Sequence, residues 1–344
     1  MSEAVVSAGR TAWRGKLGTE VQAARPRLDV RRVLQLVLAG IWLVDAMLQY
    51  QSFMFTKAFG QMLAESADGN PAVIARPITW DATLVEHHLV LLNTVFATIQ
   101  LVLGLGIAFR PTVRVALAAS IAWSLGVWWF GEGLGGVLNG GASPVNGAPG
   151  GVILYALLAV LLWPAGRDAP FIAARAVGAR VAKALWLVLW LSQAYFALTP
   201  ANRAPQALNG VIAGMESGQP GWLAAIDRGA AALVAQQGLA ASIVLAIAAM
   251  IIAVAVYLPE RAARAGLVLA IIVAAVIWVV GQNFGMILAG GATDPNSGPL
   301  LALLALAYWP ARTAATAAPA LPAAGTAMPP AAGTARPPAE GTAI

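Results

Sequence analysis

The stretch WWFGEGLGGVLNGGASPVNGAP (residues 128–149) returns in altered form as WVVGQNFGMILAGGATDPNSGP (residues 278–299), with nine identical positions and no gap. Shorter echoes lie upstream: GNP at residue 69 and GQP at 218, LVEHH at 84 and LVAQQ at 233, and a tryptophan at 42 and at 190. Self-similarity at a fixed spacing indicates that a structural unit has been duplicated. We therefore predict two copies of one unit, over about residues 30–165 and 180–310.

The composition indicates a membrane protein, because 59% of the 344 residues are hydrophobic and only 10% are charged. A helix needs about 20 mostly apolar residues to cross a bilayer. Six apolar runs suit such helices, and two shorter ones each follow a glycine-rich stretch that can supply the missing length. The predicted fold class is an all-α polytopic membrane protein with eight transmembrane helices as two parallel four-helix repeats, because an even number of spans orients both copies alike. The six long runs are 33–55, 88–109, 113–130, 182–198, 239–258 and 265–284, and the short ones are 149–163 and 299–309.

The distribution of basic residues predicts the orientation. With eight spans and a cytoplasmic N-terminus, the outer segments hold only four of the 21 lysines and arginines, namely Lys57, Arg76, Arg203 and Arg228. Such an excess of basic residues on one side is typical of cytoplasmic loops. We expect a multi-pass protein of the plasma membrane with both termini in the cytoplasm. Its predicted segments are a basic cytosolic tail (1–31), a first repeat (32–165), a cytosolic linker (166–183), a second repeat (184–311) and a disordered Ala/Pro/Gly/Thr tail (312–344).

Several classes of chemistry are excluded by residue content. The chain has no cysteine, which rules out disulfides, thiolate metal sites and iron–sulfur clusters. The glycine-rich stretches lie in or beside spans without a flanking strand, so they are not nucleotide-binding loops. The net charge of +6 reflects orientation, and we expect the lipid bilayer, not nucleic acid, as the partner.

The two copies differ in one direction at the aligned polar positions. Asp45 aligns with Gln193 and Glu132 with Gln282, while the segment from Glu86 to His88 aligns with Ala235 to Gln237. The first copy thus has groups that can titrate where the second has none. Two interpretations remain open: the first copy alone kept protonation or ligand chemistry, or a handful of positions drifted.

Polar residues form two stripes in the first copy. Asp45, Gln49 and Ser52 follow helical spacing on the first span, and Glu86, Asn93 and Gln100 recur every seven residues on the second. An ionised carboxylate within a span is costly, so Asp45 is expected to be neutral, paired or next to water. The stripes act either as interhelical hydrogen-bonding contacts or as a proton or ligand path. That path would enter at the outer side past Glu86, His87, His88 and Glu132 and end near Asp45. The candidate proton or ligand site comprises Asp45, Gln49, Glu86, His87, His88, Asn93, Gln100 and Glu132.

No metal site is predicted, because consecutive helical residues such as His87 and His88 project about 100° apart and cannot readily share one ion. Catalytic residues and cofactors are left unassigned. Three functions stay open: an accessory subunit or scaffold, a proton-coupled small-solute transporter that uses the cavity between the repeats, and a quinone- or metal-dependent membrane enzyme.

A family resemblance is carried by IQLVLGLGIAFRPTVRVALAASIAWSL (residues 99–125), in which a helix ends in Leu-Gly-Leu-Gly, followed by a basic turn and an alanine-rich helix. With four helices and a long loop after the first, this unit resembles the DoxX and DoxD-like membrane proteins in tandem duplication. The full-length pattern, including MFTKAF and GEGLGG, resembles an uncharacterised family of actinobacterial integral membrane proteins. The resemblance implies an accessory role in membrane redox chemistry beside a membrane or extracytoplasmic redox partner. The missing cysteines depart from the redox-active members, and no functional residue is carried over.

Overall fold

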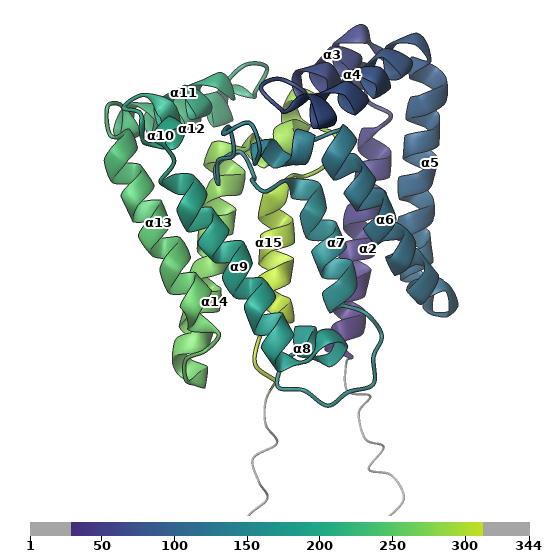
Figure 1. Ribbon diagram of the computed structural model, residues 1–344, viewed down its shortest axis with the longest axis vertical. Helices are drawn as coiled ribbons and strands as arrows, with labels where there is room; N and C mark the ends of the chain where they lie inside the picture. The colour runs from purple at the N-terminus through teal and green to yellow at the C-terminus, as the bar shows by residue number, and fades with distance from the viewer. Residues whose placement is uncertain (1–28, 312–344) are drawn as a thin grey trace, which may run out of the picture. The chain divides into compact units, whose positions relative to one another are not determined.

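The computed structural model describes residues 29–311, and within them every regular element is a helix and no strand occurs (Figure 1). The tail predicted for 312–344 lies outside the described residues, as does all but the last part of the basic tail predicted for 1–31. The all-helical class predicted from the composition is confirmed.

Four helices are long and apolar enough to cross a membrane: Leu89–Ala108, Arg110–Phe130, Gly238–Ala255 and Glu260–Ala289. The first is α5 and the third is α13. The second joins η2 (Arg110–Thr112) to α6 (Val113–Phe130), and the fourth joins α14 (Glu260–Val276), η4 (Ile277–Gly281) and η5 (Asn283–Ala289). Alanine and leucine favour helices, and the exposed valines, leucines and isoleucines on these helices suit contact with lipid tails.

Four further helices run beside the long ones. α2 (Val30–Leu48) contains Arg31, Arg32 and Asp45, and α9 (Ala179–Ala197) contains Arg180 and Lys183, which lowers their overall hydropathy. The other two, α7 (Gly151–Leu161) and α15 (Ser297–Ala307), are apolar but short. At 1.5 Å per residue a helix of this length covers only about 16 Å, roughly half of a hydrocarbon core.

The short helices α7 and α15 lie in the middle of the helical array (Figure 1). On one side α2 packs on α5, α5 on α6, and α6 on α7; on the other α9 packs on α13, α13 on α14, and α14 on α15. Contacts of α15 with α7 and α2 join the two sides. The core between them is rich in aromatic rings, with the Trp42 and Tyr155 centroids 4.3 Å apart and those of Trp186 and Tyr308 4.7 Å apart.

The segments between the first two predicted spans of each copy are helical, not irregular. Residues 52–87 form η1 (Ser52–Phe55), α3 (Lys57–Glu65) and α4 (Ala72–His87), and residues 200–234 form α10 (Pro200–Arg203), α11 (Ala207–Gly214) and α12 (Gly221–Val234). α2 therefore ends at Leu48, seven residues before the predicted end of the first span, because the chain turns there toward α3. The predicted linker 166–183 likewise contains α8 (Ile172–Val177) and the first turn of α9.

Two predicted polar stripes are broken by these helix ends. Ser52 lies in η1 and is exposed, so it does not continue the stripe of Asp45 and Gln49. His88 has a non-helical backbone (φ −131°, ψ 34°) that separates α4 from α5. Glu86 therefore belongs to a different helix from Asn93 and Gln100. The prediction that these three residues, spaced seven apart, form one stripe on a single helix is wrong.

Candidate functional site

A cavity of about 270 Å³ lies among α2, α3, α4, α5, α6 and α7, and one loop from the other side of the molecule reaches it. Its wall is mostly apolar, with a polar set gathered toward the ends of α2 and α6. The apolar lining includes Trp42, Phe59, Met62, Leu63, Phe96, Trp123, Val127 and Phe130. The polar lining is Asp45, Gln49, Asp81, Gln100, Glu132, Tyr155, Thr293 and Asp294.

Asp45 is the most buried of the carboxyl groups in this cavity, with only 1% of its surface exposed. It lies on α2 one turn before Gln49, and its Oδ1 has no hydrogen-bond partner within residues 29–311. The Oε1 atoms of Gln49 and Gln100 and the hydroxyl of Tyr155 are equally unpartnered there. A buried polar atom without a partner costs about 1–3 kcal/mol, so these groups call for water or a polar ligand in the cavity.

Glu132 lies where the chain leaves α6, in the first crossing loop (residues 131–150). Its Oε1 accepts a hydrogen bond of 3.1 Å from the backbone N–H of Val152, in the first turn of α7, while its Oε2 is shut off from solvent without a partner in the described chain. A carboxylate beside exposed N–H groups at a helix start is favoured by the helix dipole. Burial and, next, the charge of Asp294 nevertheless raise the pKa of Glu132 to about 8, against the opposing bonds from the amides of Gly151 and Val152.

Asp294 comes from the second crossing loop (residues 282–296), which connects η4 to α15. Its Oδ1 accepts from the backbone N–H of Asn296 at 2.6 Å and its Oδ2 from the Thr293 hydroxyl at 2.9 Å. Burial raises the pKa of the Asp294 carboxyl above its ordinary range, and these two hydrogen bonds oppose the rise. The site is therefore built from both sides of the molecule.

The crossing of the two loops is held by side-chain amides. Gln51, just after α2, donates to the carbonyl of Ala292 in the second crossing loop (3.1 Å). In the reverse direction, Gln193 of α9 donates to the carbonyl of Ala148 in the first crossing loop (2.5 Å). Each loop thus leaves its own helix and is anchored on the opposite side of the molecule.

Each crossing loop begins with an unusual turn of four consecutive residues with positive φ. They are residues 133–136, with φ of 51°, 59°, 63° and 71°, and residues 283–286, with φ of 43°, 56°, 72° and 62°. The left-handed conformation costs about 1–2 kcal/mol for each residue that has a side chain. Leu134, Asn283, Phe284 and Met286 bear this strain. At Gly135 a Cβ would stand 2.0 Å from the carbonyl oxygen of Pro149, so only glycine fits.

A second, more polar cavity of about 350 Å³ adjoins the first, and we call it the vestibule. It is lined by the glycines and polar residues of the first crossing loop, among them Asn139, Ser143 and Asn146. Glu132, Thr293 and Asp294 line both spaces. Two carboxyl groups and a hydroxyl therefore form the partition between a polar vestibule and a mostly apolar cavity.

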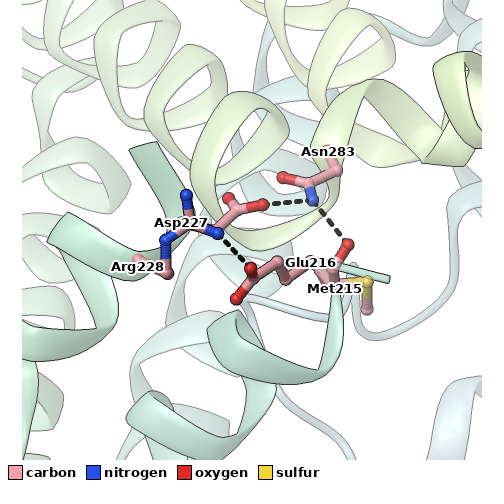
Figure 2. Close-up of polar contacts among 5 residues, drawn as sticks. All are labelled: Met215, Glu216, Asp227, Arg228 and Asn283. Atoms are coloured by element: carbon pink, nitrogen blue, oxygen red, sulfur yellow. Dashed lines mark hydrogen bonds and ion pairs between the residues drawn. The ribbon is translucent and has the colours of Figure 1, made fainter. Parts of the chain in front are cut away.

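A hydrogen-bonded polar cluster lies beside the start of the second crossing loop (Figure 2). Asn283 donates to Asp227 Oδ2 at 2.7 Å and to the carbonyl of Met215 at 2.8 Å, and Arg228 pairs with Glu216. Asp227 is fully buried, and Asn283 is its hydrogen-bond donor. This cluster fastens α12 and the end of α11 to the left-handed turn, which is a structural role.

The eight candidate residues predicted from the sequence divide into two groups. Asp45, Gln49, Gln100 and Glu132 line the cavity, and Asn93 is buried beside them, where its amide donates to the carbonyl of Gln49 (2.6 Å). The other three do not line it: Glu86 packs on Gly60 of α3, and His87 and His88 are exposed.

Sequence reasoning missed Asp294, Tyr155 and Asp81 as cavity residues. Asp294 aligns with Pro144, so it departs from the pattern in which only the first copy holds the titratable group, but the alignment does not place it at the cavity. Among residues 29–311, no group of three or more His, Asp or Glu side chains is placed to hold a metal ion.

Comparison with known proteins gives no match to a family model, a curated protein or a solved structure. The resemblance to DoxX and DoxD-like proteins therefore remains a prediction.

Proposed function

We propose that the protein is a proton-coupled transporter of a small solute, which passes between the vestibule and the apolar cavity beside Glu132 and Asp294. The observation that carries the proposal is the partition: two carboxyl groups stand between a polar and an apolar space, and Glu132 Oε2 has no partner in the described chain. A carboxyl with a pKa near 8 changes charge close to physiological pH, which suits a group that exchanges a proton with a solute.

The polar residues of the cavity support transport over a purely structural role. If they were interhelical glue, their side-chain atoms would be paired with one another. Asn93 does bond to α2, but Asp45 Oδ1, Gln49 Oε1 and Gln100 Oε1 have no partner within the described residues. An accessory subunit of a redox complex, the other function that the sequence suggests, gains no comparable support from this geometry.

The proposed setting is a plasma-membrane protein of eight spans, in two parallel four-helix repeats, with both termini in the cytoplasm. α2 and α9 would span despite their charged residues, and the crossing loops would extend the short helices α7 and α15 to the outer surface. In this setting the solute passes through a cavity within the first repeat, completed by a loop of the second, and not through a cavity between the repeats.

Exchanged contacts support the duplication. In the α5–α6 hairpin Gly106 faces Ala116, and in the α13–α14 hairpin the aligned positions hold Ala255 and Gly266, so glycine and alanine have traded places across the same close approach. The same close approach of a glycine and an alanine therefore occurs at aligned positions of both hairpins, which supports the proposed duplication.

A flux assay tests the proposed function. Proteoliposomes containing an internal pH dye would receive three aromatic solutes of similar size: benzyltrimethylammonium, phenylacetate and phenylacetamide. We expect at least one solute to drive proton movement above that of protein-free liposomes, and Glu132→Gln to abolish it. The control is Glu260→Gln, which removes an exposed carboxylate that pairs with Arg264. The proposal would be overturned if none of the three solutes drove proton movement above that of protein-free liposomes, or if the movement were equal in wild type and Glu132→Gln.

The orientation is tested separately, and the absence of native cysteine makes every introduced cysteine unique. We expect a membrane-impermeant maleimide to label Lys57→Cys and Ala204→Cys on intact cells, and Arg110→Cys and Arg261→Cys only after lysis. Labelling of all four on intact cells would contradict the eight-span topology.

A further inference from the structure

The chemical class of the solute can be inferred from the charges around the cavity. Four carboxyl groups line it, from α2 (Asp45), α4 (Asp81), the first crossing loop (Glu132) and the second (Asp294). No lysine, arginine or histidine of the described chain lines it. A buried carboxylate without a basic partner is costly, and a bound cation would remove that cost.

Aromatic rings make up much of the remaining wall. Trp42 packs on Tyr155 next to Asp45, and Phe96 lies 5.7 Å from Trp123 between ring centroids on the facing helices α5 and α6. The faces of such rings attract organic cations, most strongly in a desolvated site. A strongly hydrated metal ion would instead need several converging oxygen ligands, and residues 29–311 contain no group of three or more His, Asp or Glu side chains placed to hold one.

We infer that the cavity binds a small hydrophobic organic cation, an aromatic or quaternary amine, with its charged nitrogen beside Asp45 and its apolar part among Trp42, Phe96 and Trp123. This inference rests on the proposed transport function and names its substrate class. The cavity volume of about 270 Å³ is close to the lower end of the range for small-molecule pockets, about 300–1,000 Å³, so it suits a small ligand.

Charge balance gives the coupling. The titratable groups that face the cavity are the four carboxyl groups and the Tyr155 hydroxyl. When a monovalent cation enters, one carboxyl O–H bond breaks, its electron pair stays on the carboxylate, and the proton leaves through the vestibule. Glu132 is placed for this release because it lines both spaces. Each cation that enters is therefore exchanged for one proton, and the net charge of the site is unchanged.

Gly126 offers a direct way to close the cavity. It lies on α6 in the lining, and a Cβ built on it meets no atom within 4 Å. A larger side chain there extends into the cavity without strain in the backbone. Gly40 of α2 is a matched control, because a Cβ there also meets nothing within 4 Å, but the residue does not line the cavity.

The test is binding of benzyltrimethylammonium to the full chain in lipid nanodiscs, followed by calorimetry and by quenching of tryptophan fluorescence. We expect wild type and Gly40→Leu to bind it, Gly126→Leu and Asp45→Asn to weaken binding by about tenfold or more, and the affinity to rise from pH 6 to pH 9. Phenylacetate, of the same size and opposite charge, is expected not to bind.

Three outcomes would overturn the inference: no binding to wild type, equal binding to Gly126→Leu, or preferential binding of phenylacetate. The proposed function can still be tested separately. Proton movement driven by phenylacetate or phenylacetamide in proteoliposomes would support proton-coupled transport while excluding an organic cation as the substrate. Thermal unfolding of each variant separates loss of binding from loss of folding.

Discussion

Replacing Glu132 by glutamine is expected to stabilise the protein at alkaline pH and to leave its stability unchanged at acidic pH. The carboxyl is half-buried with Oε2 unpartnered, and its pKa rises from 4.5 to about 8 on folding. A group that binds its proton more tightly when folded makes the folded state lose stability as pH rises between the two pKa values. Glutamine resembles the neutral acid and retains the oxygen that accepts from Val152.

The size of the effect follows from the two pKa values. The interval between 4.5 and about 8 corresponds to about 5 kcal/mol at 1.36 kcal/mol for each tenfold change in proton affinity. The difference in unfolding free energy between Glu132→Gln and wild type is therefore expected to be near zero at pH 4.5, about 3 kcal/mol at pH 7 and about 5 kcal/mol at pH 9.

Denaturant unfolding in detergent micelles, followed by tryptophan fluorescence at these three pH values, measures the difference. Glu260→Gln is the control, because Glu260 is exposed and its surface ion pair with Arg264 contributes only about 0–1 kcal/mol. A difference that is the same at pH 4.5 and pH 9, or a Glu132→Gln variant that is less stable than wild type at pH 9, would refute the reasoning.

Three further predictions concern the loops. Asp294→Asn should remove the negative charge that, after burial, is the second cause of the raised pKa of Glu132. The pKa of Glu132 should then fall toward its ordinary value, and the variant should lose less stability than wild type between pH 4.5 and pH 9 in an unfolding titration. Gly135→Ala should prevent folding of the first crossing loop, because of the carbonyl 2.0 Å from the new Cβ, whereas Gly140→Ala, with positive φ but open space, should cost only about 1–2 kcal/mol in an unfolding titration. Asn283→Ala should cost about 1–3 kcal/mol by the same measurement, because buried Asp227 loses its donor.

The helical class and the positions of the long helices were predictable, because apolar runs of sufficient length leave few alternatives. Asp45 and Glu132 were recognised for a related reason, since a carboxyl within or beside an apolar run is conspicuous. The break at His88 was not predictable, because LVEHHLV contains neither proline nor glycine to mark it. That break removes Glu86 from the stripe that its spacing suggested.

Asp294 could not be predicted as a cavity residue for a different reason. An acidic residue in a glycine-rich loop is expected to be solvated. Asp294 reaches the cavity because the loop crosses toward α2, where the hydrogen bond between Gln51 and Ala292 holds it. Contacts between residues 241 positions apart leave no periodicity in the sequence from which to infer them.

The crossed loops also bear on ancestry. In the proposed duplication, a single ancestral unit would have lacked part of this cavity wall, because Thr293 and Asp294 come from the loop of the other unit. Such an ancestor would have worked as a homodimer with two equal sites. Under that proposal, fusion into one chain would have released one loop from serving a second site, and the two halves could then have diverged in sequence.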